Sequence, residues 1–80
     1  MKATVLVRPK TGILDPQGEA VGSSLRQLGF DVADARVGRV VDLELEATDP
    51  ARARKELDRM CRHLLANPLI ESYEIALEGE

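Results

Sequence analysis

The sequence predicts an α+β protein with the ferredoxin-like order βαββαβ, in which two helices cover one face of a four-stranded antiparallel sheet. Two observations lead to this prediction. A strand-helix-strand pattern occurs twice along the chain, and both helices begin at an Asp-Pro pair, at 15–16 and at 49–50. The expected strand order is fourth, first, third, second. With 80 residues, the chain is expected to form a single domain over 1–80.

The first half contains a strand and a clearly marked helix. Residues 3–8 alternate with the period of a strand, which places Ala3, Val5 and Val7 on one face and Thr4, Leu6 and Arg8 on the other. We expect the Asp15 carboxylate to accept hydrogen bonds from the free N–H groups of the first helical turn. Pro16 then occupies the first helical position, where its missing N–H costs nothing. The helix ends at Gly29. It is expected to bury three apolar side chains at helical spacing: Val21, Leu25 and Leu28.

Two strands are predicted between the helices. The stretch 32–37 is a short and less apolar strand that leads to Gly38. A tight turn at this glycine would make 32–37 the antiparallel neighbour of 41–47. The stretch 41–47 alternates most strictly of all, with acids on its outer side, and we expect these acids to be solvated rather than to bind a metal.

The second helix is strongly amphipathic. It begins at the second Asp-Pro pair and ends at Asn67-Pro68, and a last alternating strand covers 72–78. The expected apolar stripe consists of five residues: Ala53, Leu57, Met60, Cys61 and Leu64. A basic stripe on the other side is either a solvated face or a docking surface for an acidic partner: Arg52, Lys55, Arg59 and Arg62.

This arrangement leaves one face of the sheet without a helix. We expect Leu6 and Val40 on that open face, among Thr4, Arg8 and the acids of 41–47, so the face is only partly polar. A chain of this size buries only about 60 to 65% of its unfolded surface. Its one cysteine, Cys61, excludes an internal disulfide, so association with another subunit is the remaining source of burial. The open face suits such contact.

Composition excludes several partners. The net charge of −3 and the presence of only two aromatic residues argue against nucleic-acid binding. No stretch approaches the roughly 18 apolar residues that a membrane span requires. The start of the chain has no apolar signal region, so we expect a cytoplasmic protein with no membrane partner.

No catalytic, cofactor-binding or metal-binding residues are predicted. The single histidine, His63, lies on a helix flank, and a cysteine inside an apolar stripe is not activated. Neither GxGxxG nor GxxxxGK[ST] occurs. An acylphosphatase-like hydrolase would need an arginine cradle and a strand asparagine. Arg8 and Lys10 could mimic the cradle, but the only asparagine, Asn67, stands beside a proline at a helix end.

Four segments carry a resemblance to a known family. They are GILDPQGEA at 12–20, LGF at 28–30, VGR at 37–39 and CRHLLANPLIESYE at 61–74. In this order and spacing they resemble the PurS subunit of phosphoribosylformylglycinamidine synthase over nearly the whole chain. Arg39 stands where that family often has lysine, which keeps the charge.

The resemblance implies a non-catalytic assembly subunit of de novo purine biosynthesis. Such a chain bridges a glutaminase subunit and an ATP-dependent synthetase subunit so that ammonia passes between them. It implies a homodimer or homotetramer, a ligase activity only in the complex, no cofactor in this chain, and ATP and magnesium for the synthetase. We assign six residues to partner contact: Arg8, Lys10, Gln17, Gly18, Arg39 and Asn67. Two alternatives stay open, an ACT-like regulatory domain that binds a small molecule and a small hydrolase.

Overall fold

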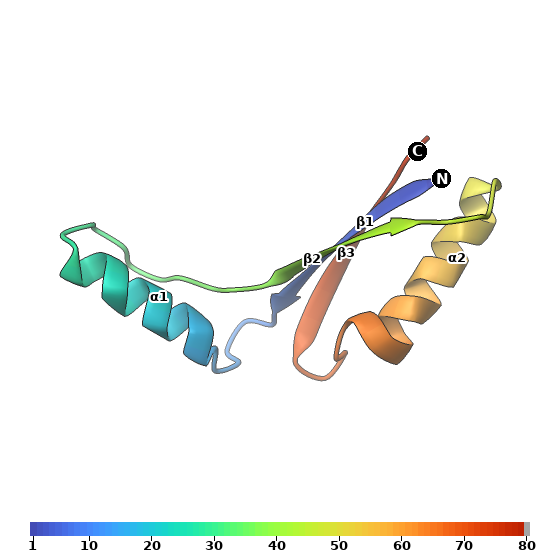
Figure 1. The fold of residues 1–80 in the computed structure, drawn as a ribbon. Coiled ribbons are helices and arrows are strands. Elements are labelled where there is room, and N and C mark those ends of the chain that lie inside the picture. Colours follow the sequence, from blue (N-terminus) through green and yellow to red (C-terminus); the bar gives the residue numbers. More distant parts are fainter. Residues whose placement is uncertain (80) are drawn as a thin grey trace.

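A computed structural model describes residues 1–79 of the chain (Figure 1). The class is α+β, as expected from the sequence. The elements follow in the order β1 (Lys2–Pro9), α1 (Pro16–Gln27), β2 (Arg39–Glu44), α2 (Pro50–Met60), the π-helical turn η1 (Cys61–Leu65) and β3 (Glu71–Leu77). No helix among the described residues is long and apolar enough to cross a bilayer.

The sheet has three antiparallel strands in the order β2-β1-β3, with β1 in the centre. Leu6 of β1 lies opposite Val40 of β2 on one side and Glu74 of β3 on the other. Helix α2 and η1 run along one face of this sheet, whereas α1 lies at the far end of the molecule (Figure 1).

The core lies between the sheet and α2. Because strand side chains alternate, every second residue of β1 faces the helix. Leu57 at the centre of α2 has no exposed surface. The other buried hydrophobic residues of this core are Ala3, Val5, Val7, Ala53, Cys61, Ala66 and Leu77. Asp49 begins α2 as the sequence predicts, since its carboxylate accepts a hydrogen bond from the Ala51 N–H at 3.2 Å.

The prediction of a four-stranded sheet is wrong. Residues 32–37 form no strand, and the chain runs on through Gly38 into β2 without a turn. Gly38 does not adopt positive φ, and a Cβ at this position would overlap the Val7 carbonyl oxygen. The glycine therefore permits close approach of the backbone to β1. It does not form the predicted hairpin.

The segment 32–37, predicted as a strand, packs against α1 instead of the sheet. A Cβ at Gly18 would overlap the Ala35 carbonyl oxygen, so the backbone of 35–36 lies directly on the helix at this point. Gly22, one turn later, also faces Ala35. Two glycines on one side of α1 thus let the backbone of this segment approach the helix closely. Larger side chains at these positions would prevent this contact.

The predicted burial of α1 is also wrong. Val21 is 43% exposed and Leu28 is 74% exposed, and only Leu25 is half-buried. Because α1 and 31–38 extend away from the sheet, the molecule measures 48 × 24 × 15 Å. Its radius of gyration is 15.7 Å, against roughly 12 Å for a compact domain of this length. The apolar side of α1 is not covered by its own chain.

One residue of the predicted apolar stripe of the second helix is turned outward. Leu64 is 83% exposed, because the π-helical turn η1 widens the helix before it ends. In η1 the Ala66 N–H donates to the Cys61 carbonyl oxygen at 2.9 Å. Ala66 therefore takes the buried place that a regular helix would give to Leu64.

Candidate functional site

Three loops meet at one end of the sheet, which we call the loop end: residues 9–15, 36–39 and 65–71. The Lys10 N–H donates to the Ile70 carbonyl oxygen at 2.9 Å, and the Lys10 ammonium donates to the Pro68 carbonyl oxygen at 2.6 Å. Arg36 Nη2 donates to the carbonyl oxygens of Lys10 and Ile13 at 2.9 and 3.1 Å. These bonds join all three loops, although they lie far apart in the sequence.

A cavity of about 200 Å³ lies where the loops join. Its lining comes from the three loops and from the ends of β1, α1, β2 and β3 that adjoin them, and consists of Pro9, Ile13, Leu14, Asp15, Gln17, Val37, Gly38, Arg39, Ile70 and Glu71. The cavity therefore has an apolar side and a charged side.

Arg39 ties the third loop to the sheet. Its guanidinium donates to both carboxylate oxygens of Glu71, at 2.7 and 3.1 Å, and to the Leu65 carbonyl oxygen. Glu71 also accepts a hydrogen bond from the Asn67 N–H at 2.7 Å. The hydrogen bond from Arg39, and then that from Asn67, lower the pKa of Glu71, while Glu71 raises the pKa of Arg39.

Asn67 shapes the tip of the same loop. Its side-chain oxygen accepts a hydrogen bond from the Leu69 N–H at 3.1 Å, and its carbonyl oxygen accepts from the N–H groups of Ile70 and Glu71. This is the local hydrogen bonding typical of asparagine in turns. The side chains of Leu69 and Ile70 are consequently held outward, 83% and 42% exposed.

Asp15 joins α1 to the segment before β2. We expected its carboxylate to cap the first turn of α1, but it makes no such hydrogen bond and instead accepts one from the Val37 N–H at 2.7 Å. This bond is the main cause of a lowered pKa for Asp15, and the electrostatic effect of the nearby Gly18 N–H and of the Arg36 charge lowers it further. The carboxylate is diverted because 35–37 folds back onto the helix.

The loop end exposes its cations and covers its carboxylates. The Arg39 side chain is 48% exposed and its partner Glu71 only 19%. The Arg36 side chain is 34% exposed, whereas Asp15, 3.9 Å from it, is 10% exposed. Lys10 is exposed as well. Although the chain carries a net charge of −3, this end presents positive charge to the solvent.

The structure brings four of the six residues assigned to partner contact together at the loop end: Lys10, Gln17, Arg39 and Asn67. Arg8 lies instead on the open face of the sheet, where it pairs with Glu74 at 2.9 Å. Gly18 is buried beneath Ala35. The assignment of these residues to partner contact stays a prediction. Sequence reasoning missed Leu14, Leu69 and Ile70, although apolar residues in turns were a visible signal.

The acids, cysteine and histidine of the described residues do not form a reactive cluster. No group of three or more His, Cys, Asp or Glu in 1–79 is placed to hold a metal ion. Burial raises the pKa of the Cys61 thiol, which keeps it protonated and unreactive. The Tyr73 hydroxyl donates to Asp58, which raises the tyrosine pKa. In the basic stripe of α2, Arg52 and Arg62 pair with acids one turn away, at 3.2 and 2.9 Å.

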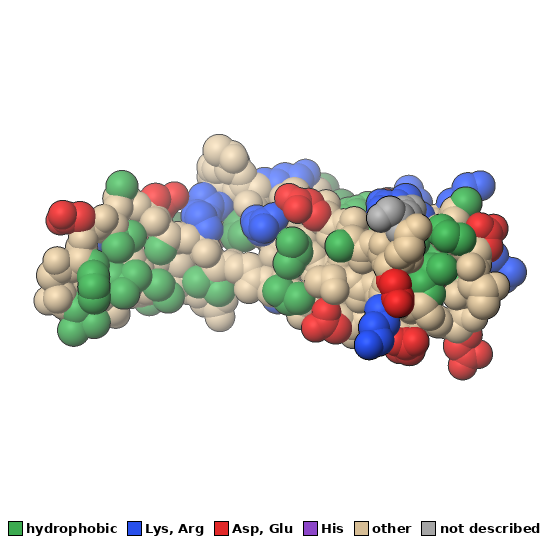
Figure 2. Space-filling view, turned by 90° about the horizontal axis from the view of Figure 1, so that it is seen from above, with side chains coloured by type: hydrophobic (Ala, Val, Ile, Leu, Met, Phe, Trp, Pro, Cys, Tyr) green, Lys and Arg blue, Asp and Glu red, His purple; other side chains and the backbone are tan. Residues whose placement is uncertain are grey.

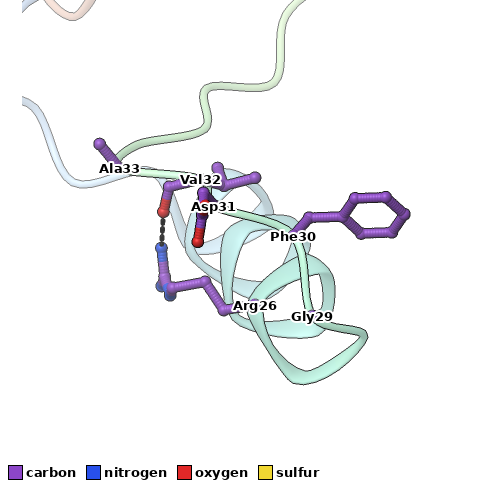
Figure 3. A pocket seen from close by; sticks show the side chains of 6 residues that line it. All are labelled: Arg26, Gly29, Phe30, Asp31, Val32 and Ala33. Carbon is purple, nitrogen blue, oxygen red and sulfur yellow. Dashed lines mark hydrogen bonds between the residues drawn. The ribbon is translucent and has the colours of Figure 1, made fainter.

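A second hollow, of about 520 Å³, lies at the far end of α1 (Figure 3). Arg26 reaches across it and donates to the Val32 carbonyl oxygen at 3.0 Å. The Phe30 ring points away from the other residues of the hollow and is 59% exposed. An exposed aromatic ring is better suited to contact with another protein than to enclosing a small molecule.

Comparison with known proteins decides the family. Residues 2–79 match the PurS family, described as phosphoribosylformylglycinamidine (FGAM) synthase. The chain belongs to the PurS family. It is 53% identical over 79 residues to the phosphoribosylformylglycinamidine synthase subunit PurS of Synechocystis, covering 94% of this chain and 77% of that protein. The PurS subunit of Methanocaldococcus jannaschii is 37% identical over 78 residues, covering 96% and 94%.

Solved PurS structures have the same fold. The M. jannaschii PurS crystal structure, one of the subunits of formylglycinamide ribonucleotide amidotransferase, has a TM-score of 0.81 at 37% identity, over 94% of this chain and 92% of that one. A chain in the structure of PurLQS from Thermotoga maritima has a TM-score of 0.85 at 33% identity, over 94% and 93%. The resemblance to PurS is confirmed, and nothing in these matches supports the ACT-like alternative.

Proposed function

We propose that this PurS-family chain is the non-catalytic assembly subunit of phosphoribosylformylglycinamidine synthase in purine biosynthesis. The observation that carries the proposal is the match of residues 2–79 to the family, together with the likeness to a chain of the PurLQS structure of T. maritima. In this role the chain holds a glutaminase subunit against a synthetase subunit so that ammonia passes between them. ATP and magnesium act in the synthetase, and the complex works in the cytoplasm.

The structure supports a role in contact rather than in chemistry. The thiol is buried and protonated, and the described acids form no metal-binding group. Large apolar side chains are exposed at two places on the molecule: Leu28 and Phe30 at the far end of α1, and Leu14 and Leu69 at the loop end, where α1 meets the sheet. Apolar surface left open in this way marks sites of protein contact.

We further propose that the chain forms a homodimer or homotetramer through α1 and the open parts of the sheet. Hydrophobic side chains gather over the α1 end of the molecule (Figure 2), where Val21, Leu28 and Phe30 are exposed. On the open face, Val40 is 58% exposed beside Leu6. β2 is also an edge strand whose outer side can accept a further strand. A second copy would cover apolar surface that the chain cannot cover itself.

Reconstitution with its two partners tests the assembly role. Glutamine-dependent synthesis of the amidine by purified glutaminase and synthetase should require this chain, and the chain alone should show no amidotransferase, glutaminase or ATPase activity. Equal synthesis from glutamine without the chain would contradict the assembly role. Light scattering during size-exclusion chromatography tests self-association separately. A mass at least twice that of the 8.8 kDa chain is expected, and a monomer would contradict it.

A further inference from the structure

We propose that the loop end binds a protein of different sequence, through a surface on which that protein presents an apolar side chain flanked by Asp and Glu. The inference deepens the assembly role proposed above and assigns it a contact surface. The apolar part of this surface consists of Leu14, Leu69 and Ile70, and the basic part of Lys10, Arg36 and Arg39.

The apolar side chains are exposed to an unusual degree. Leu69 is 83% exposed and Leu14 is 76% exposed, while Ile70 is 42% exposed. Leu14 and Ile70 come from loops more than fifty residues apart, yet they line the same cavity. A lone exposed leucine needs no explanation, but apolar residues gathered at one rim from separate loops mark a contact site.

The loops that carry them are already fixed. Lys10 holds the loop of Ile70 through a backbone and a side-chain hydrogen bond, and Arg36 holds the loop of Leu14 through the Ile13 carbonyl oxygen. Asn67 fixes the turn that presents Leu69. A surface ordered before binding loses little conformational entropy when the partner arrives. These loops therefore present a preformed contact surface.

The positive charge of the loop end indicates that the partner presents carboxylates to it. Lys10 and the guanidinium groups of Arg36 and Arg39 reach the solvent, while the carboxylates that pair with the two arginines are 10% and 19% exposed. A partner with carboxylates around an apolar projection would meet complementary charge and be drawn to it. The cavity of about 200 Å³ is smaller than the roughly 300–1,000 Å³ of small-molecule sites, so one apolar side chain suits it better.

A second copy of this chain is a poor occupant of the loop end. In a two-fold dimer each surface meets its own copy, so Lys10 and the two arginines would face the same cations. The apolar side of α1, a helix that extends away from the loop end, carries no such cluster of cations and is left for self-association (Figure 1).

Binding to purified partners tests the surface directly. The full-length double variant Leu14→Ser/Leu69→Ser should bind the glutaminase or the synthetase at least about tenfold more weakly in calorimetric titrations, as expected when central apolar contacts are lost. Lys10→Glu should weaken the same interaction and reduce its dependence on salt. The matched control is Leu28→Ser, which removes an equally exposed leucine (74%) from the far end of α1.

The control should retain affinity for both partners within about threefold while losing self-association on the size-exclusion column. The leucine variants should melt within about 3 °C of the original chain, since the changed side chains are exposed. Unchanged binding of the double variant to both partners would overturn the assignment of the loop end, even where the chain is still required for synthesis. Equal loss in Leu28→Ser would overturn it as well. If synthesis does not require the chain, the assembly role itself fails.

Discussion

The two helices of this chain begin with the same dipeptide, Asp-Pro, but one is packed against the sheet and the other is not. Helix α2 packs along the sheet and buries Leu57 completely, whereas α1 leaves Leu28 three-quarters exposed and packs only against the segment that follows it. Both have an apolar side at helical spacing. The difference shows that an amphipathic pattern predicts that a helix will be covered, but not that its own chain will cover it.

The largest expected effect is in the α2 half. Leu57→Ala should destabilise the chain by about 2–5 kcal/mol, because it leaves a cavity in the core. That is a large part of the roughly 4–12 kcal/mol expected for 80 residues. Urea unfolding at low protein concentration measures it. Leu28→Ala in α1 is the matched control and should change stability by less than about 0.5 kcal/mol. Similar losses in both variants would show that α1 is as well covered as α2.

The second expected effect concerns the packing of 35–37 on α1. Gly18→Ala places a Cβ against the Ala35 carbonyl oxygen and should cost about 1–3 kcal/mol, as overpacking does. Gly22→Ala is the control, because its Cβ would lie 3.3 Å from the mobile end of Arg26 and 3.5 Å from Ala35. This change should stabilise the helix by up to about 1 kcal/mol.

Hydrogen exchange of the amides of 33–38 would locate the effect of Gly18→Ala. Faster exchange there, with the sheet unchanged, is expected because the segment leaves the helix. Equal protection in Gly18→Ala and Gly22→Ala would show that the contact between the helix and this segment does not hold the α1 half together.

A third and smaller effect distinguishes two arginines. Arg39→Ala removes hydrogen bonds to Glu71 and to the Leu65 carbonyl oxygen and should cost about 1–2 kcal/mol. Arg8→Ala removes an exposed ion pair with Glu74 and should cost less than about 1 kcal/mol. Thermal melting of both variants measures the difference. If Arg8→Ala proves the more destabilising, the loop end is not the better ordered of the two surfaces.

The smallest effect is a dependence on pH. The pKa values of Asp15 and Glu71 are lower in the folded chain than their ordinary values. Their stabilising contribution is therefore complete above the unfolded pKa of about 4 and is lost as pH falls through the folded pKa values. Asp15→Asn should flatten the fall in urea midpoint below about pH 4.5, whereas Gln17→Ala should leave it unchanged. If the urea midpoint of Asp15→Asn falls as steeply with decreasing pH as that of the original chain, this carboxylate is not a source of the pH dependence of stability.

Patterns that act locally predicted much of this molecule. Alternation located β1, β2 and β3, and the order of these three strands in the sheet is as expected. The start of α2 at Asp49 was predictable from its own residues. The structure of 32–37 was not predictable in this way, because it depends on contacts between residues far apart in the sequence. The backbone at Ala35 packs closely on Gly18, and Gly38 lies against the Val7 carbonyl oxygen without forming a turn.

The residues of the candidate site were predictable only in part, because the site is formed by contacts between segments far apart in the sequence. Gln17, Arg39 and Asn67 lie in three separate segments that resemble the family, and Lys10 was added from the loop before the first helix. The fold places all four at the loop end. Leu14 and Leu69 lie in two of the same segments and beside turn residues, but apolar side chains are ordinarily expected in the core. Leu69 looks like an ordinary apolar residue until the turn of Asn67 directs it outward.

The central place of β1 has a consequence for how the chain is made. Lys2 pairs with Glu44 and Ala3 with Leu77, so β1 needs partner strands that are synthesised after it. At synthesis rates of roughly 5–20 residues per second, about 4 to 15 seconds pass between the synthesis of β1 and that of β3. Throughout that time its apolar residues have no complete sheet to join. Contacts so distant in sequence also slow the folding step itself, so the sheet is expected to form only after β3 has been synthesised, when chaperones or partner subunits can already reach the chain.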